Sequence, residues 1–268
     1  MSKWSLLLVW SISMLDSAFA YNPKVNVTIY GDDAYPPYSY VQKEKIKGIY
    51  VDILSAAFTR MPDYSVTIEP LPWKRGLKML EVGEGFALFP PYYYSDQRPY
   101  ISPYSEPILK EEVVVMCRPE TITNRRTENW PADYHDLTIG VNEAYALGGN
   151  AFWQAIAQGN ILLKEAKSNR ASMTNLYKHR IDCYMNDRLS ILWELKLMKD
   201  EGIIEQDWTP VIATSVSSEH GYLGYTHDPN NRFHFKEDFV LRFNQALKAI
   251  KADGTMDNIL DAYRQAYR

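Results

Sequence analysis

The fold is decided by residues 25–68, which read VNVTIYGDDAYPPYSYVQKEKIKGIYVDILSAAFTRMPDYSVTI. At its start, Val25, Val27 and Ile29 alternate with polar residues, which is typical of a strand with one buried face. Residues 49–61 then carry apolar side chains at helical spacing, and residues 66–68 are β-branched. A strand, a helix and a second strand in this order predict a βαβ unit with parallel strands.

The rest of the chain continues the same alternation. Strand patterns occur at residues 86–89, 112–118, 137–141, 161–163, 181–185 and 222–225, with amphipathic helices between several of them and two more near the C-terminus. We therefore predict an α/β fold. Because no low-complexity linker separates the two halves, we expect short crossing strands to join them.

Composition excludes several classes of protein. The 268 residues are 46% hydrophobic with a net charge of −4, so neither a disordered chain nor a nucleic-acid-binding protein is expected. Two cysteines, Cys117 and Cys183, are too few for a four-cysteine zinc site. The five histidines do not have the spacing of metal ligands. We therefore expect no metal and no cofactor.

Residues 1–20 are predicted to be a secretory signal peptide. Lys3 precedes an apolar run, and Ala18-Phe19-Ala20 is typical of a cleavage site. Tyr21 follows in place of the cysteine that a lipoprotein would carry. We expect a soluble, exported protein, in which a Cys117–Cys183 disulfide is chemically permitted.

Aromatic and charged residues gather just after the predicted strands, and several lie in the run Tyr92-Tyr93-Tyr94 and at Arg98. The carboxyl ends of strands in open α/β sheets are where ligands bind. Aromatic rings form flat walls, arginine binds carboxylates and aspartate suits an amine. The alternative is that the aromatic residues serve packing and that Arg98 is a solvated surface charge. The distribution of these aromatic and charged residues over both halves of the chain favours binding. The candidate ligand-binding residues are Tyr35, Tyr38, Trp73, Tyr92, Tyr93, Arg98, Tyr145 and Asp187.

The order of several short motifs resembles the family-3 extracellular solute-binding proteins, the periplasmic receptors of polar amino acid ABC transporters. The motifs are Tyr35-x-Pro37-Tyr38, Gly48-Ile49-Tyr50-Val51-Asp52-Ile53, Pro72-Trp73, Ser95-Asp96-Gln97-Arg98, His179-Arg180-Ile181-Asp182 with Asp187, and Lys251-Ala252-Asp253-Gly254-Thr255.

This resemblance implies the type II periplasmic binding fold, with two lobes, each a mainly parallel sheet flanked by helices, that close on a ligand by hinge motion. Residues 21–115 would begin lobe 1, 116–215 would form lobe 2, and 216–268 would return to lobe 1. Arg98 would bind the ligand carboxylate, Asp187 the α-amino group, and Tyr35 and Trp73 would be the aromatic walls. The chain would be a monomer that serves an ABC permease or a sensor.

The state of the two cysteines and the kind of ligand stay open. The family topology places the strands of Cys117 and Cys183 side by side, so a disulfide and two reduced thiols are both compatible with it. Pro91 and Tyr93 replace small hydroxyl residues of the family pattern, and Ala144-Tyr145-Ala146 replaces a Gly-Ser/Thr-Thr segment. A bulkier or peptide-like ligand, or a narrower pocket, is therefore an alternative to a standard amino acid.

Two other functions are compatible with the same scaffold. A periplasmic dehydratase-like enzyme would need an acid or base, for which Glu143 and Asp187 are the candidates. A ligand-sensing partner of a membrane receptor could use Arg125 and Arg126 for contact. Because no catalytic motif occurs in the sequence, we expect a binding protein rather than an enzyme.

Overall fold

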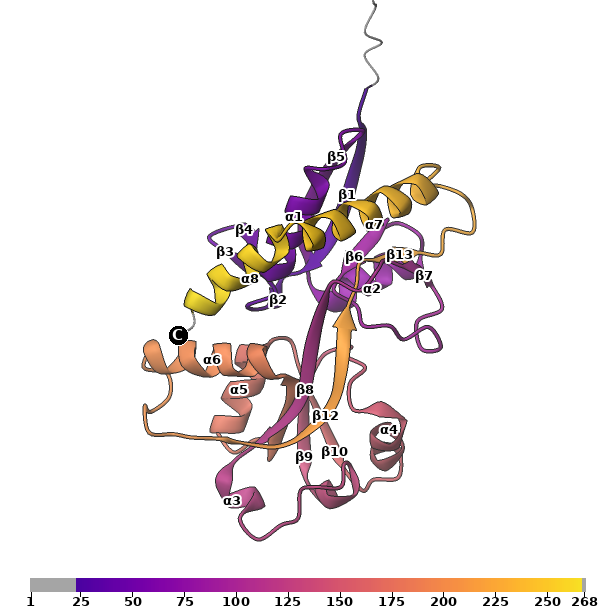
Figure 1. The fold of residues 1–268 in the computed structure, drawn as a ribbon. Helices are drawn as coiled ribbons and strands as arrows, with labels where there is room; N and C mark the ends of the chain where they lie inside the picture. Colours follow the sequence, from indigo (N-terminus) through magenta and orange to yellow (C-terminus); the bar gives the residue numbers. More distant parts are fainter. Residues whose placement is uncertain (1–22, 267–268) are drawn as a thin grey trace, which may run out of the picture.

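The computed structural model describes residues 23–266, so the predicted signal peptide lies outside the described residues. Figure 1 shows two halves, one above the other, joined by two long strands that run between them. Each half contains a five-stranded sheet flanked by helices. The predicted two-lobed α/β fold is confirmed.

The first half is built on the sheet order β5-β1-β6-β13-β7. Strands β5, β1 and β6 are parallel, while β13 and β7 complete the sheet in antiparallel pairs. The strands are β1 (Val25–Asp32), β5 (Tyr64–Leu71), β6 (Ala87–Phe89), β7 (Ile101–Tyr104) and β13 (Gly224–Thr226), and the helices are α1 (Ile49–Phe58), α2 (Trp73–Glu81), α7 (Lys236–Ala252) and α8 (Thr255–Ala266).

The second half repeats this plan in the order β10-β9-β11-β8-β12, again with three parallel strands and two antiparallel ones. The strands are β8 (Leu109–Cys117), β9 (Thr138–Asn142), β10 (Leu162–Ala166), β11 (Cys183–Asp187) and β12 (Val211–Gly221). The helical elements are α3 (Pro119–Ile122), the 3₁₀ turn η1 (Ala132–Tyr134), α4 (Gly149–Ala157), α5 (Asn169–Tyr177) and α6 (Arg188–Asp200).

Strands β8 and β12 form the connection between the halves. Residues 113–117 of β8 pair with both β11 and β12, whereas residues 109–112 pair only with residues 218–221 of β12. This two-stranded ribbon confirms the expected crossing strands. The lobe boundaries expected at residues 115 and 215 fall inside β8 and β12.

The two cysteines, whose state the sequence left open, are bonded to each other. Cys117 of β8 lies opposite Cys183 of β11, and the two form a disulfide whose Cα atoms are 4.0 Å apart. Both are buried in the core of the second half. The bond therefore ties a crossing strand to the centre of the second sheet.

Sequence reasoning did not predict several elements. Residues 34–47, where no strand was predicted, contain the aromatic loop Tyr35-Pro36-Pro37-Tyr38 and form a small sheet of β2 (Ala34–Tyr35), β3 (Ser39–Gln42) and β4 (Lys45–Lys47). Strand β12 and helix α6 were also absent from the predicted pattern. Most residues of β12 are only partly buried, so its sequence lacks the apolar alternation that marks a half-buried strand.

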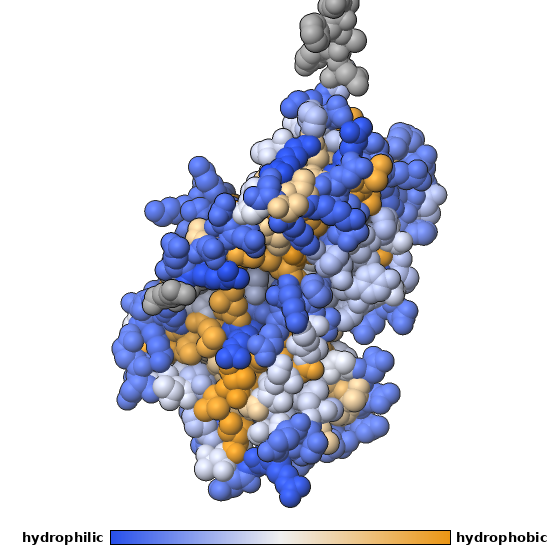
Figure 2. Space-filling model, viewed as in Figure 1, coloured by the Kyte–Doolittle hydropathy of each residue, from blue (hydrophilic) through white to orange (hydrophobic). Residues whose placement is uncertain are grey.

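The surface in the view of Figure 2 is mostly hydrophilic. Hydrophobic residues gather in a patch that runs from the junction of the two halves down over the lower half. No helix among residues 23–266 is long and apolar enough to cross a membrane.

Gly48 fixes the aromatic loop against helix α1. Its φ of 127° lies in a region that side chains disfavour, and a Cβ atom there would stand 2.3 Å from the Tyr38 carbonyl oxygen. The close approach lets the N–H groups of Ile49 and Tyr50 donate to the carbonyls of Pro37 and Tyr38, at 3.0 Å each. The loop that carries Tyr35 is thereby held at the start of α1.

We expect Gly48→Ala to lower the free energy of unfolding by more than about 1 kcal/mol, because it adds a steric clash to an unfavourable φ. Urea denaturation followed by circular dichroism measures the change. Gly83→Ala is the control, since Gly83 also has a positive φ of 70° but nothing lies within 4 Å of its Cβ position. Equal losses in the two variants would contradict a clash at Gly48.

Candidate functional site

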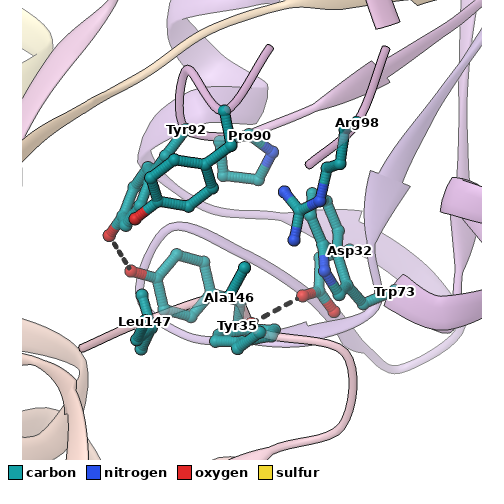
Figure 3. A pocket seen from close by; sticks show the side chains of 10 residues that line it. Asp32, Tyr35, Trp73, Pro90, Tyr92, Arg98, Ala146 and Leu147 are labelled. Carbon is teal, nitrogen blue, oxygen red and sulfur yellow. Dashed lines mark hydrogen bonds between the residues drawn. The ribbon is translucent and has the colours of Figure 1, made fainter. Parts of the chain in front are cut away.

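The carboxyl ends of the parallel strands of both sheets meet between the two halves, and a pocket lies there (Figure 3). Figure 3 shows Arg98, Trp73 and Asp32 on one side and Tyr92 and Leu147 on the other. The residues that line it are Asp32, Tyr35, Trp73, Pro90, Tyr92, Tyr94, Arg98, Tyr145, Ala146 and Leu147. Residues 144–147 follow β9 of the second half, so both halves form the walls.

Arg98 is a buried cation, with only 6% of its surface exposed. Its guanidinium carbon lies 5.6 Å from the centre of the Trp73 ring and 5.7 Å from that of Tyr94, within reach of cation–π attraction. Its Nη2 donates to the Ala144 carbonyl oxygen of the other half at 3.0 Å. Burial lowers the pKa of the guanidinium. Among residues 23–266, no carboxylate forms an ion pair with it.

Asp32 ends β1 and is almost fully buried. One carboxylate oxygen accepts from the Ala34 N–H at 2.9 Å, and the other accepts from the Tyr145 hydroxyl of the second half at 2.8 Å. Burial raises the pKa of Asp32 to about 7, against the lowering effect of these two hydrogen bonds. The Asp32–Tyr145 contact therefore crosses the pocket and joins the halves.

Five of the eight predicted site residues meet in this pocket: Tyr35, Trp73, Tyr92, Arg98 and Tyr145. Tyr38 is buried beside Tyr35, their ring centres 4.9 Å apart, and is not part of the pocket wall. Tyr93 is 58% exposed and packs instead against Tyr104 and Tyr222.

Asp187 is buried at the end of β11 but does not line the pocket. Its oxygens accept from the N–H groups of Ser190, at the start of α6, and of Glu112, at 2.9 and 3.1 Å. Burial raises its pKa to about 6. The amine-binding role expected for Asp187 stays a prediction.

Sequence reasoning missed two buried carboxylates, Asp32 and Glu111. Asp32 is the last residue of β1, just before the loop that carries Tyr35. Because ligands bind at the carboxyl ends of strands, its position could have marked it as a candidate. Glu111 lies in the crossing strand β8, where its polar neighbours gave no sign of burial. Its carboxylate accepts from the hydroxyls of Tyr35, Tyr50 and Tyr92. Burial, followed by the nearby charge of Asp187, raises its pKa to about 8.

The pocket is narrow. Its free volume is about 30 Å³, room for one or two water molecules. A wider groove of about 740 Å³ adjoins it, sharing Asp32, Trp73 and Tyr145 in its wall. A ligand as large as an amino acid therefore fits at Arg98 only if the walls move apart. Within residues 23–266, no cluster of side chains is arranged to hold a metal ion.

Residues 27–266 match the family model described as bacterial extracellular solute-binding proteins, family 3. The chain belongs to this family. No curated protein matches it in sequence.

Solved structures of this family share the fold of the chain. The arginine-, lysine-, histidine-binding protein ArtJ of Geobacillus stearothermophilus superposes with a TM-score of 0.68 at 17% identity, covering 89% of this chain and 94% of ArtJ. A structure from work on glutathione import via GshT and the cystine ABC importer TcyBC of Streptococcus mutans has a TM-score of 0.71 at 16% identity, covering 90% and 95%.

A sensor protein has the same architecture. A histidine kinase sensor domain with similarity to periplasmic binding proteins superposes with a TM-score of 0.71 at 13% identity, covering 89% of this chain and 96% of that domain. At these identities, the structural comparisons establish the fold and not a ligand.

We expect the family-3 protein to lose stability as the pH rises from 5 to 8. Asp187, Asp32 and Glu111 have pKa values raised to about 6, 7 and 8 in the folded chain, above the ordinary values of 3.8 for aspartate and 4.5 for glutamate. The folded state therefore binds more protons than the unfolded state across this range, and its stability falls with pH. Melting temperatures measured between pH 5 and 8 check this, and a flat or rising profile would contradict it.

Proposed function

We propose that the chain is a periplasmic solute-binding protein that captures a small polar ligand, an amino acid or a related zwitterion, between its two halves. The observation that carries this proposal is the buried guanidinium of Arg98 in the pocket. A buried cation is costly unless a partner balances it. A ligand carboxylate would be that partner, and guanidinium groups bind carboxylates through paired hydrogen bonds.

The pocket also suits the amine of such a ligand. The charged residues in its wall are Asp32 and Arg98, one of each sign, which matches a zwitterion. Because Asp187 does not line the pocket, we assign the ammonium group to Asp32 in its place and to the faces of the neighbouring aromatic rings, which attract cations. Trp73 adds a buried indole N–H that has no hydrogen-bond partner among the described residues and is available to a ligand.

Closure of the halves is the proposed binding step. Hydrogen bonds join the two halves. Arg98 donates to the Ala144 carbonyl, and Tyr145 donates to Asp32. The Ser190 hydroxyl donates to the Pro36 carbonyl at 2.5 Å. The narrow pocket must open at the ribbon of β8 and β12 to admit a ligand. A ligand that touches both halves then stabilises the closed form, because its contacts are lost on opening.

The proposed partner is an ABC permease in the inner membrane, served by a monomer that is not lipid-anchored. The fold shared with a histidine kinase sensor domain favours a membrane sensor as the second candidate. Pull-down from membranes, with and without a ligand that shifts the melting temperature, separates the two: a permease recovered only with the ligand supports uptake. Catalysis is not part of the proposal.

Arg98→Ala should abolish the thermal shift produced by ligands found in a screen of amino acids, short peptides and amines. Each charge-assisted hydrogen bond is worth about 1.5–3 kcal/mol, so its loss weakens binding about tenfold or more. The matched control is Arg264→Ala, which removes an exposed arginine from helix α8. Unchanged affinity in Arg98→Ala would remove Arg98 from the site.

Asp32→Asn should weaken the binding of ligands that carry an ammonium group and spare anionic ligands that lack one. In the unaltered protein, affinity for an ammonium ligand should rise as the pH passes upward through about 7, because Asp32 then becomes charged. Isothermal titration calorimetry at pH 6 and pH 8 measures both effects. An ammonium ligand whose affinity does not depend on Asp32 would place the amine elsewhere.

A further inference from the structure

Glu111 lies at the junction of the halves and is only 2% exposed, and within residues 23–266 no cation forms an ion pair with it. It lies in the ribbon where β8 pairs with β12 alone, opposite Glu219. Among the described residues, its hydrogen-bond partners are three tyrosine hydroxyls: Tyr92 at 2.7 Å, and Tyr35 and Tyr50 at shorter distances. One carboxylate therefore gathers three rings from three different segments of the chain.

Two of these rings belong to the pocket wall. Tyr35 and Tyr92 both line the Arg98 pocket, and their hydroxyls lie 3.4 Å apart. A dashed line joins the two hydroxyls in Figure 3. Tyr50 lies in helix α1 behind them and does not reach the pocket. Glu111 does not line the pocket either, so any effect on a ligand passes through Tyr35 and Tyr92.

We propose that Glu111 is a positioning residue of the binding site, whose carboxylate fixes the Tyr35 and Tyr92 walls to the ribbon that joins the halves. The pocket width next to Arg98 is then set by a group on the hinge, and an opening movement of the ribbon is transmitted to these two walls. This inference rests on the proposed ligand-binding function of the same pocket.

The crossing strand β12 packs against the cluster formed by Glu111 and the Tyr35, Tyr50 and Tyr92 rings. At Gly221, a Cβ atom would stand 1.8 Å from the Tyr50 hydroxyl and 3.0 Å from a Glu111 carboxylate oxygen. The absence of a side chain at this position leaves the space that the Tyr50–Glu111 contact occupies. The cluster is thus enclosed by both strands of the ribbon and by α1, and its rings have little freedom to rotate.

The groups that face Glu111 support a fixed arrangement. The hydroxyls of Tyr35, Tyr50 and Tyr92 bond to it, and Asp187 acts on it by charge. Its own charge acts in turn on Tyr38 and Tyr94. Because burial and Asp187 raise the pKa of Glu111 to about 8, the group is mostly protonated at neutral pH, when its own O–H donates one hydrogen bond to a tyrosine oxygen. Above pH 8, all three hydroxyls can donate to the carboxylate.

The test compares Glu111→Gln with two controls. Glutamine keeps the size of the side chain, but its amide nitrogen donates, so it cannot accept from all three hydroxyls. Glu112→Gln makes the same change at the next residue of β8, whose side chain forms an exposed pair with Arg188. Tyr64→Phe removes another tyrosine–carboxylate bond, to Asp238 at 2.7 Å, in the first half and away from the pocket.

The first readout is binding, with the twenty L-amino acids and reduced glutathione as probes. For any probe bound by the unaltered protein at about pH 9, where Glu111 is charged and accepts from all three hydroxyls, Glu111→Gln should raise Kd about tenfold or more, the loss of about one strong hydrogen bond. Both controls should stay within about twofold, although Tyr64→Phe lowers the melting temperature. This split separates positioning from a general loss of stability, and an unchanged Kd in Glu111→Gln would overturn the proposal.

The second readout needs no ligand. In protein labelled with [ζ-¹³C]tyrosine, the resonances of Tyr35 and Tyr92, assigned with Tyr35→Phe and Tyr92→Phe, should shift together near pH 8 and lose this titration in Glu111→Gln alone. Resonances that titrate in the same way in Glu111→Gln would overturn the proposal. If no probe binds, the proposed function is contradicted and these resonances still decide the role of Glu111.

The two phenylalanine variants provide a second test of the same proposal. Should Glu111→Gln fail to fold, Tyr35→Phe and Tyr92→Phe each remove one bond to the carboxylate while keeping the ring. Each should weaken probe binding in the same direction, and affinities equal to that of the unaltered protein in both would count against the proposal.

Discussion

The buried guanidinium of Arg98 is the constraint around which the site is arranged. It lies against the Trp73 and Tyr94 rings, and it donates a hydrogen bond to the Ala144 carbonyl of the opposite half. Aromatic faces and a neutral carbonyl compensate a buried charge only in part, because neither carries a full negative charge. The pocket therefore favours an anionic group, and that group would also touch the half that contributes Ala144.

The ribbon of β8 and β12 carries a buried acidic group, Glu111, which is mostly protonated at neutral pH and charged above about pH 8. Glu111 is held by hydroxyls rather than by a cation, and Asp187 lies near enough to raise its pKa. This places the acidic groups on the ribbon side and Arg98 on the ligand side of the same tyrosine walls. Tyr35 and Tyr92 thus make two kinds of contact, since their rings line the pocket and their hydroxyls bind Glu111 of the ribbon.

Membership of the family explains the arrangement of two sheets and two crossing strands, and leaves the pocket to be explained by this chain's own residues. The Asp32–Tyr145 bond spans the pocket, and Tyr145 stands in the segment where the family pattern has small hydroxyl residues. A large ring at this position fills space between the halves. The cavity beside Arg98 is narrow, and a wider groove adjoins it.

Local patterns in the sequence were enough to predict the alternation of strands and helices and five residues of the pocket wall, because periodicity and strand ends are local features. The crossing strands followed from the lack of a low-complexity linker. Tertiary structure alone decided that Cys117 and Cys183 are bonded, that residues 34–47 form a sheet, and that Asp187 caps α6 outside the pocket. It also buried Asp32 and Glu111. The physical reason is that burial and the pairing of distant side chains depend on which strands become neighbours, which no single stretch of sequence specifies.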